Sequence, residues 1–593
     1  MSVLETPRVL FKGKVAWDPI VTNNSPQFYD ENTDSTMFPT VPDKVRAFRQ
    51  LAIGAVAQGG NWNPHGTHRV NFYESNVSGV DQGTGVTGND PFVSSDVILN
   101  AMLVDLEPYG AISSQLFFDS LLLGVDGGYR IFCKRQSRMT ARYINFSRNP
   151  ANNMIAGIAS VVWQTSFSKA DGVIIDAFDS PTLAALKAAL EYDDVLGLTV
   201  QFNCYRTVYY DDPTLSNGSP ATTQAGRDLA VKLQGGGFQP NPARSDMVGV
   251  IGLWRKGEPI HEPGDRTLLP TPTTAVAAAH TRLSSTSITI DLSNCIPEID
   301  RNLTKQDLGT LSIIALASQA GSDVLLGSLP YDEYNKTAYE ASSGIVTVQL
   351  TPQQAQAAAA QDIAIRDGQG NTLLTEAALR VIPSSPNVYL DEGTNQKVTF
   401  QAYQRGIPAN GPLPLSVYTM TADGGAIANT ASMQADANGV LTMNIQGTSG
   451  GTIPYVVASP NDPPPSGGID TQANTYMYTR TLAADAQIAA LPATWPNVYS
   501  QVLANWNAMA PCMDNWLMLN DPLQVRKFAH IIKRLTDPAN FEHYRYMPVT
   551  RDMTAGMRSL LYRFLDMPDD QLGTLDLTAP AQPVSKSRAM RRP

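Results

Sequence analysis

Two similar stretches, 194–202 and 246–254, constrain the fold of this chain more than any other feature of its sequence. Each begins with an aspartate and continues as a run rich in Val, Leu and Ile that is apolar on both faces. Runs of this length, bounded by turn residues, are typical of strands buried on both sides. Gly197 and Gly249 take the fourth position of each run, which indicates a bulge or a close backbone approach. Because two such strands must share a core, we expect them to be neighbours in one sheet.

A helix is predicted immediately before the first of these strands, over residues 180–192. Its apolar residues recur at the helical period and fall on one face: Leu183, Leu186, Ala189 and Leu190. We therefore expect the helix and the two strands to form one packed core element. Nothing in that element supplies a nucleophile or a metal site.

Composition limits the architecture to which this core belongs. With 593 residues the chain is too long for one core, so two to four domains are expected. Charged residues make up only 16%, and there are 44 glycines and 41 prolines, which favours a loop-rich β protein over a helical bundle. The formal net charge of −11 argues against nucleic-acid binding, which needs a basic face.

The sequence also predicts the cellular environment. Its four cysteines are too far apart for a CxxC pair, so we expect buried thiols rather than a zinc site or disulfides. The N-terminus lacks the apolar core of a signal peptide, and no apolar stretch is long enough to span a membrane. We expect a cytoplasmic protein that does not bind a membrane.

The predicted fold is mainly β: a multi-domain, β-sandwich or jelly-roll-like body with a small C-terminal helical unit. Residues 262–272, rich in Pro and Gly, are predicted to be a linker, and the Pro-rich stretch 461–468 a hinge. Residues 211–246 are predicted to be a loop excursion of the kind that forms lids or partner contacts. The predicted domains are an N-terminal β-rich domain (1–265), a second β-rich domain (276–385), a small β-sandwich (386–460), a helical unit (469–566) and a disordered tail (567–593).

Two glycine motifs resemble known sites but lack the structural context that those sites need. Residues 83–88, Gly-Thr-Gly-Val-Thr-Gly, fit the dinucleotide fingerprint, which requires a helix directly behind it. Asn-Asp-Pro follows instead, so we interpret the motif as a glycine-rich loop. Residues 447–451 match the nucleophile elbow around Ser449, which requires a strand-to-helix turn. A strand-like segment follows, so we expect Ser449 in a hairpin.

The histidines leave several alternatives open. The segment 61–68, Asn-Trp-Asn-Pro-His-Gly-Thr-His, carries His65 and His68, which could bind a metal together with Glu74. Loop histidines lack the fixed spacing of a metal motif, so we favour a structural corner, with ligand contact as a third possibility. His530, on a predicted helix, is more typical of a buried or interface residue than of an axial ligand. No metal site is predicted.

Several of these stretches, in the same order, resemble the imine dimer synthases of bisindole biosynthesis, the VioB and chromopyrrolate synthase family. The Asp-Met-Val-Gly stretch is the most specific of them. The similarity is carried by residues 7–13, by 61–64 with Gly66 and His68, by 193–201, by 246–258 and by Tyr546-Met547-Pro548. The chain resembles the N-terminal half of the proteins in that family, and the similarity covers nearly the whole chain.

This resemblance implies an oxidative enzyme that couples two indole-3-pyruvate imine molecules, with haem as a family cofactor. It also implies a ferritin-like helical half beyond the Tyr-Met-Pro block, which we do not expect in this chain. A ferritin-type carboxylate site needs Glu-x-x-His on a helix. The match at residues 258–261 contains Pro259, and Pro263-Gly264 follows it, so a regular helix is not expected there.

Two functional hypotheses follow. The first, which we favour, is a non-catalytic scaffold or recognition subunit that pairs with a separate ferritin-like oxidase or forms a homo-oligomer. The second is a stand-alone haem- or metal-dependent imine dimer synthase. The weak candidates for cofactor binding are His68, His530 and His543; no catalytic residue is predicted.

Overall fold

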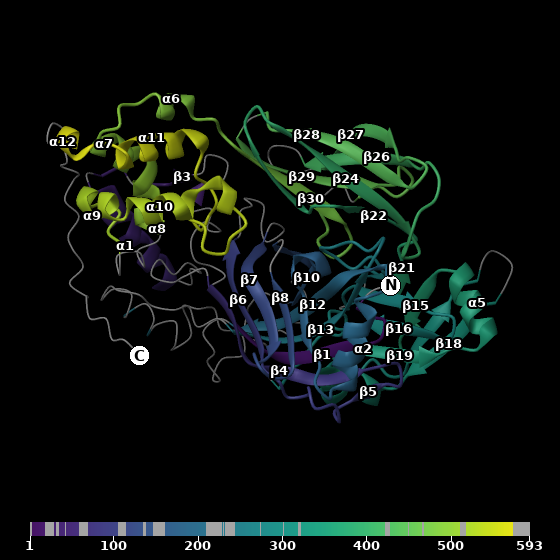
Figure 1. Cartoon of the computed structure of the whole chain (residues 1–593). Helices are drawn as coiled ribbons and strands as arrows, with labels where there is room; N and C mark the ends of the chain where they lie inside the picture. Colours follow the sequence, from purple (N-terminus) through teal and green to yellow (C-terminus); the bar gives the residue numbers. More distant parts are fainter. Residues whose placement is uncertain are drawn as a thin grey trace.

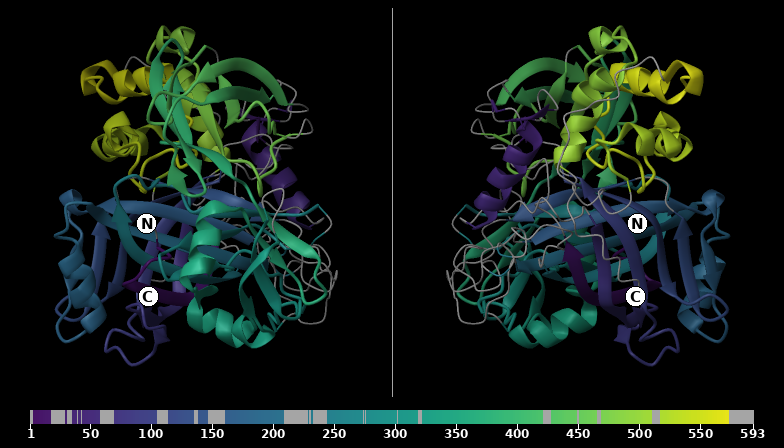
Figure 2. Two further views of the ribbon diagram at one scale, coloured as in Figure 1. Left: turned by 90° about the vertical axis from the view of Figure 1, so that its right-hand side faces the viewer. Right: turned by 90° about the vertical axis from the view of Figure 1, so that its left-hand side faces the viewer.

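The chain folds into two barrel-like sheets, a β-sandwich and a helical unit, which confirms the mainly β fold (Figure 1). The sandwich and the helical unit lie on one side of the molecule and the two barrel-like sheets on the other (Figure 2). The computed structural model describes residues 3–17, 29–30, 35–38, 40–41, 43–57, 69–104, 114–134, 138–145, 160–208, 228, 231, 244–272, 274, 276–300, 302–317, 322–420, 427–448, 450–464, 468–509 and 517–572.

The first sheet closes into an antiparallel barrel. Its strand order β7-β6-β4-β1-β13-β12-β10-β9 returns to β7, because β9 pairs with the start of that strand. The end of β7 pairs with β8, and β11 extends the sheet beyond β8. The strands are β1 (Arg8–Trp17), β4 (Arg69–Asp81), β5 (Val86–Thr87), β6 (Val97–Val104), β7 (Gln115–Gly124), β8 (Arg130–Lys134), β9 (Met139–Asn145), β10 (Ser160–Ser168), β11 (Ile174–Asp176), β12 (Val195–Val208) and β13 (Arg244–Arg255).

The two echoing stretches are β12 and β13, which pair directly and are largely buried, as predicted. Their glycines are needed for close approaches. A Cβ at Gly249 would lie 2.2 Å from a ring atom of Phe11 on β1, and one at Gly197 would lie 1.8 Å from the carbonyl oxygen of Phe167. A register shift adjoins Gly197, so the predicted bulge or close backbone approach is confirmed there, whereas the close neighbour of Gly249 is a side-chain ring.

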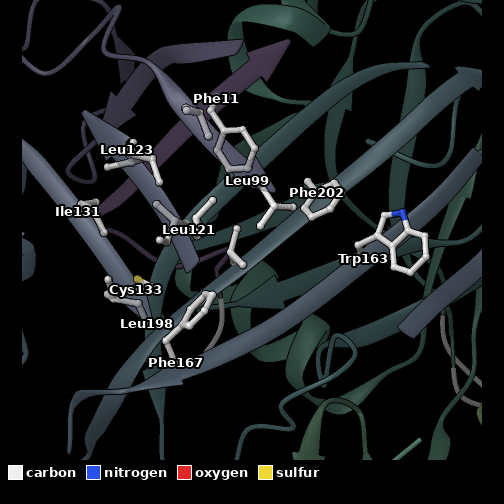
Figure 3. Close-up of a cluster of buried hydrophobic side chains, with 14 of the residues drawn as sticks. Phe11, Leu99, Leu121, Leu123, Ile131, Cys133, Trp163, Phe167, Leu198 and Phe202 are labelled. Carbon is white, nitrogen blue, oxygen red and sulfur yellow. The ribbon is translucent and has the colours of Figure 1, made fainter. Parts of the chain in front are cut away.

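The barrel interior is apolar. Phe11, Trp163 and Phe202 converge there with aliphatic side chains from most of the strands (Figure 3). Helix α2 (Pro181–Ala189) packs Leu183 and Leu186 against the same core. Ser180 caps this helix by accepting a hydrogen bond from the Leu183 N–H at 3.2 Å, so the predicted helix is confirmed, and it begins at its capping serine.

The second sheet is also barrel-like, with the order β18-β17-β20-β21-β14-β15-β16-β19. Its edge strands approach each other, because a Cβ at Gly327 on β18 would lie 2.4 Å from Val348 on β19. Helix α5 (Pro352–Ala360) follows its N-cap Thr351, and α4 spans Lys336–Ser342. The strands are β14 (Arg266–Pro270), β15 (Ala279–Leu283), β16 (Ser287–Asp291), β17 (Leu311–Ala315), β18 (Val324–Leu329), β19 (Ile345–Gln349), β20 (Ile363–Arg366) and β21 (Thr372–Glu376).

The linker predicted over residues 262–272 is wrong. Strand β14 lies inside this stretch and pairs with both β15 and β21. Glu262, Asp265 and Leu268 are buried. The prolines and Gly264 shape the turn that leads into the strand, while the short apolar stretch after them enters the second core.

Two packed sheets form the sandwich, and both contribute to its core through residues such as Phe400 and Met477. The predicted start of the helical unit at residue 469 is wrong. β30 belongs to the sandwich because it pairs with β23 and β29, and all of its residues are buried. The strands are β22 (Leu379–Pro383), β23 (Asn387–Asp391), β24 (Asn395–Gln404), β25 (Ile407–Pro408), β26 (Pro414–Met420), β27 (Ile427–Gln434), β28 (Val440–Gln446), β29 (Gly451–Ala458) and β30 (Tyr476–Leu482).

The helical unit follows and docks on the β body. The ring of Phe117 on β7 lies 6.4 Å from the Phe541 ring, and Thr36 Oγ1, from a separate two-stranded sheet, donates to Asn505 at 2.8 Å. Its helices share a core around Trp495, Leu560 and Phe564. The helices are α6 (Ala486–Ala489), α7 (Trp495–Val498), the π-helical η4 (Tyr499–Leu503), α8 (Ala504–Met509), α9 (Pro522–Lys527), α10 (Ala529–Thr536), η6 (Pro538–Asn540) and α11 (Ala555–Leu565); α1 (Lys44–Ala57) packs on α8.

The predicted disordered tail begins too early. Helix α12 spans Asp569–Leu572, and Arg526 donates to the Met567 carbonyl at 2.6 Å and pairs with Asp569 at 2.9 Å. Residues 573–593 lie outside the described part of the chain. Cys133, Cys204 and Cys295 are buried free thiols, as predicted, and Cys512 lies outside. Within the described residues, no helix is long and apolar enough to cross a membrane.

Candidate functional site

A cavity of about 450 Å³, the interdomain cavity, lies where the barrel, the sandwich and the helical unit meet. Ligand sites in proteins occur preferentially at such boundaries between domains, and cavities of this size hold small organic ligands. The side chains that line it and matter below are Arg138, Tyr389, Phe541, Glu542, Tyr546 and Arg558.

One wall of the interdomain cavity is aromatic. The Phe541 ring lies 4.6 Å from the Tyr389 ring and 5.4 Å from the Tyr546 ring, measured between centroids. Tyr389 comes from the sandwich, whereas Phe541 and Tyr546 follow η6 in the helical unit. Gln115 on β7 donates to the Tyr389 hydroxyl at 2.9 Å, which fixes the ring against the barrel.

Arg138 connects the first barrel, the sandwich and the helical unit at this cavity. It lies next to β9 and donates from Nη2 to the Asn387 carbonyl of the sandwich at 2.5 Å. Its Nη1 pairs with Glu542 of the helical unit. Its guanidinium also lies over the Tyr389 ring, 5.1 Å from the centroid.

Arg551 lies behind the aromatic wall and is only 1% exposed. Its guanidinium sits 3.7 Å from the centroid of the Phe117 ring and donates to the carbonyls of Val549 at 2.7 Å and His543 at 2.9 Å. Among the described residues it forms no ion pair, and its Nε has no hydrogen-bond partner. Burial lowers the pKa of Arg551 to about 10, and repulsion from Arg138 adds to this shift, so the group is still charged at neutral pH.

The charges around the interdomain cavity do not cancel. Arg138 and Arg558 line the cavity together with the carboxylates of Glu542 and Asp391, and Arg551 behind the aromatic wall adds a further positive charge. Arg558 donates to the carbonyls of Thr536 and Met553, both at 3.2 Å. A buried charge without a counter-ion destabilises a folded protein by several kcal/mol. The cavity therefore favours an anionic ligand beside an aromatic surface.

A second charged cluster holds the sandwich on the barrel. Glu262 lies 3.8 Å from Arg142 and 3.4 Å from Arg380, and all three side chains are buried. Arg380 also donates to the Tyr143 hydroxyl at 2.5 Å, and His280 contacts the same tyrosine ring at 4.6 Å. Burial lowers the pKa of His280 well below its usual value, so this histidine is neutral and the cluster is a structural junction.

A smaller pocket of about 110 Å³ lies at the turn after β13. Glu258 lines it, and its carboxylate accepts a hydrogen bond from the Arg255 N–H at 2.7 Å. Burial raises the pKa of Glu258 to about 7, and the nearby Asp265 acts in the same direction. Residues 258–261 are not helical, as predicted, and His261 is buried with a pKa that burial lowers to about 3.

Of the histidines singled out in the sequence, the structure describes His530 and His543. His65 and His68 lie outside the described residues. His530 is exposed on α10. His543 is half-buried; its Nδ1 accepts a hydrogen bond from the Arg545 N–H at 3.2 Å, and its ring stacks on Tyr544. Among the described residues, no group of three His, Cys, Asp or Glu side chains could hold a metal ion.

The haem that the family resemblance implies finds no fitting donor among the described histidines. Neither His530 nor His543 lines the interdomain cavity, and an axial ligand must face a cavity that the macrocycle can enter. Buried His261 and His280 belong to the packed junction.

The first glycine motif is a loop, as interpreted, whereas the hairpin expected around Ser449 is wrong, because β28 pairs with β24 in one sheet and β29 pairs with β26 and β30 in the other. In the first, Asp81 Oδ1 accepts the N–H groups of Gly83 at 2.8 Å and Gly85 at 3.2 Å, so a carboxylate occupies donors that a pyrophosphate would need. Arg8 pairs with Asp81 at 2.7 Å. Strand β29 follows the second motif in place of a helix, while Ser449 itself lies outside the described residues.

Fold and site together define a multi-domain, mainly β protein with an anion-favouring cavity between its domains. No family model matches the chain. Over 434 residues, 69% of its length, it is 24% identical to 2-imino-3-(indol-3-yl)propanoate dimerase of Chromobacterium violaceum. The match spans 37% of that protein's length, so the chain is a distant relative that corresponds to only part of it.

Similarity to solved structures is weak. The D0-D1 domain of intimin aligns with 33% of this chain and 90% of its own length, at 11% identity and a TM-score of 0.14. A Salmonella alpha-2-macroglobulin mutant aligns with 65% of this chain and 26% of its own length, at 9% identity and a TM-score of 0.13. Similarity at this level carries no argument about fold or function.

Proposed function

We propose that this chain is the recognition and scaffold subunit of an imine-dimerising system, and that it binds an aromatic 2-imino or 2-oxo acid in the interdomain cavity. The observation that carries this proposal is the excess of guanidinium charge beside the aromatic wall. Arg551, buried and without a carboxylate partner among the described residues, is its clearest element. The name of the distant relative supplies the ligand class, because 2-imino-3-(indol-3-yl)propanoate combines an aromatic ring with a carboxylate.

Each part of such a ligand has a matching partner in the cavity. Guanidinium groups bind carboxylates in charge-assisted pairs, and Arg138 and Arg558 both line the cavity. The rings of Tyr389, Phe541 and Tyr546 offer edge-to-face contacts to an indole or phenyl ring. These side chains would bind and orient the acid and exclude water from one of its faces.

Oxidative coupling of two imines needs an electron acceptor, which protein side chains alone do not supply. We assign that chemistry to a separate ferritin-like oxidase, with this chain as the subunit that holds the acid. The second hypothesis, a stand-alone haem- or metal-dependent synthase, places the acceptor on this chain at His68, His530 or His543.

Calorimetry with indole-3-pyruvate tests the binding role. We expect saturable binding to the wild-type protein and a loss of at least about tenfold in affinity for Arg558→Met, which removes one cavity cation. Arg563→Met is the matched control, since Arg563 lies on the same helix but donates to Ala489 and Leu491 outside the cavity. No binding by the wild-type protein, or equal losses in both variants, would refute the proposed site.

Spectroscopy and product analysis separate the two hypotheses. A scaffold shows no Soret band and no stoichiometric iron, and it consumes indole-3-pyruvate imine only when a ferritin-like oxidase is added. Stoichiometric haem that is lost in His68→Ala, His530→Ala or His543→Ala, together with coupling by the protein alone, would establish the stand-alone enzyme.

A further inference from the structure

Glu542 occupies an unusual position in the interdomain cavity, because it is the carboxylate that pairs with Arg138 there. Its side chain is 37% exposed, whereas that of Arg138 is 10% exposed. The pair joins a cation fixed to the barrel with an anion carried by the segment after η6. Arg138 has a second anchor in the Asn387 carbonyl, so it can keep its place when its partner leaves.

We propose that Glu542 is an internal counter-carboxylate: it fills the carboxylate subsite of the empty cavity, and an incoming carboxylate ligand displaces it from Arg138. This inference rests on the proposed function and names the residue that sets the affinity and the charge selectivity of the same site. The ligand class is a monocarboxylate that carries an aromatic ring.

The local charges support displacement over permanent pairing. Arg138 and Arg551 both lie against the Phe117 ring, with their guanidinium carbons 5.8 Å and 3.7 Å from its centroid. One carboxylate therefore serves two nearby cations. A ligand carboxylate that replaces Glu542 would keep this charge balance, while Glu542, whose side chain is already 37% exposed although its Oε2 is buried, moves outwards to solvent.

Glu262, at the junction between the sandwich and the barrel, is by contrast a permanent counter-ion. Its side chain is only 2% exposed and lies between Arg142 and Arg380. No solvent-facing position is open to it without separation of the sandwich from the barrel. Glu542 differs in its exposure and in lining a cavity large enough to admit a ligand.

The test measures the affinity of wild-type protein, Glu542→Gln and Asp391→Asn for indole-3-propanoate and for its neutral amide, indole-3-propanamide. Asp391→Asn is the matched control, because it removes a carboxylate from the same cavity that does not pair with Arg138. We expect Glu542→Gln to bind the acid about five to ten times more tightly than wild type and to bind the amide unchanged. Asp391→Asn should change the affinity for the acid by less than about twofold.

Glu542→Asp keeps the charge but shortens the reach, so it should give an intermediate affinity and covers the case in which Glu542→Gln does not fold. Equal affinity of wild type and both Glu542 variants for the acid would overturn this inference while leaving the proposed function intact. Weaker binding in both variants would also overturn it, because it would make Glu542 a structural support of the site. Failure of all proteins to bind the acid would refute the proposed function itself.

Discussion

The barrel interior and the interdomain cavity of this protein differ in the kind of side chain that they bury. The barrel core is built from apolar side chains, with Phe11, Trp163 and Phe202 fully buried among aliphatic neighbours (Figure 3). Around the cavity, buried arginines share the space with aromatic rings. Burial of apolar surface is the main source of folding stability. Buried charge is costly unless it is compensated. We therefore expect the barrel core to supply most of the free energy of folding and the cavity to supply ligand binding.

Truncation of a barrel-core ring should have the largest effect on stability. Phe118→Ala removes a fully buried side chain and should lower the free energy of unfolding by about 3–5 kcal/mol, through lost burial and a residual cavity. Phe178→Ala, on the same domain but 67% exposed, should change it by less than about 0.5 kcal/mol. Hydrogen exchange of β7 and β12 measures the difference; similar protection in both variants would break the comparison.

The stability of the contact between the sandwich and the barrel should depend on its buried charges. Glu262→Gln leaves Arg142 and Arg380 buried without their carboxylate and should destabilise the sandwich–barrel contact by about 2–3 kcal/mol. Glu74→Gln breaks the exposed pair with Lys14 and should cost less than about 1 kcal/mol. Faster hydrogen exchange in β22 and β30 of the first variant alone is the expected result. A harmless Glu262→Gln would show that apolar packing alone holds the junction.

Glu258 should have a smaller effect on the free energy of unfolding, and this effect should depend on pH. Glu258 has a folded-state pKa of about 7, raised by burial from an unfolded value near 4.3. Between these values the folded protein binds a proton that the unfolded chain has lost. Stability from this group is therefore complete below about pH 4.3 and falls as the pH rises to 7. Glu258→Gln should be more stable than wild type at pH 8, by about 1–2 kcal/mol, and similar at pH 4; a constant difference at both pH values would contradict this assignment.

Local sequence patterns predicted those parts of the fold that local physics determines. The doubly apolar runs identified β12 and β13, and the apolar residues that recur at the helical period identified α2. β14 and β30 were missed for different reasons. The first is short and bounded by prolines, and the second contains Arg480, which is 1% exposed although charged residues are seldom buried.

The site was much less predictable than the fold. Arg138 and Glu542 form one ion pair although they are 404 residues apart in the sequence. Arg551 follows the Tyr-Met-Pro block, but nothing in its neighbours signals that the guanidinium is buried against Phe117. The sequence indicated histidines as candidates for cofactor binding because the residue type alone suggests that chemistry. The arginines acquire their role only through packing between domains, which a single sequence does not reveal.

The position of β1 in the barrel has a consequence for how the protein is made. β1 lies between β4 and β13, and β13 ends only at Arg255. At about 5–20 residues per second, translation takes roughly 10–50 s to supply that partner after β1 has emerged. Until then one edge of β1 has no strand to pair with, and unpaired edges recruit other chains. The ribosome-bound intermediate, rather than the finished barrel, is therefore the form of this protein that most needs a chaperone.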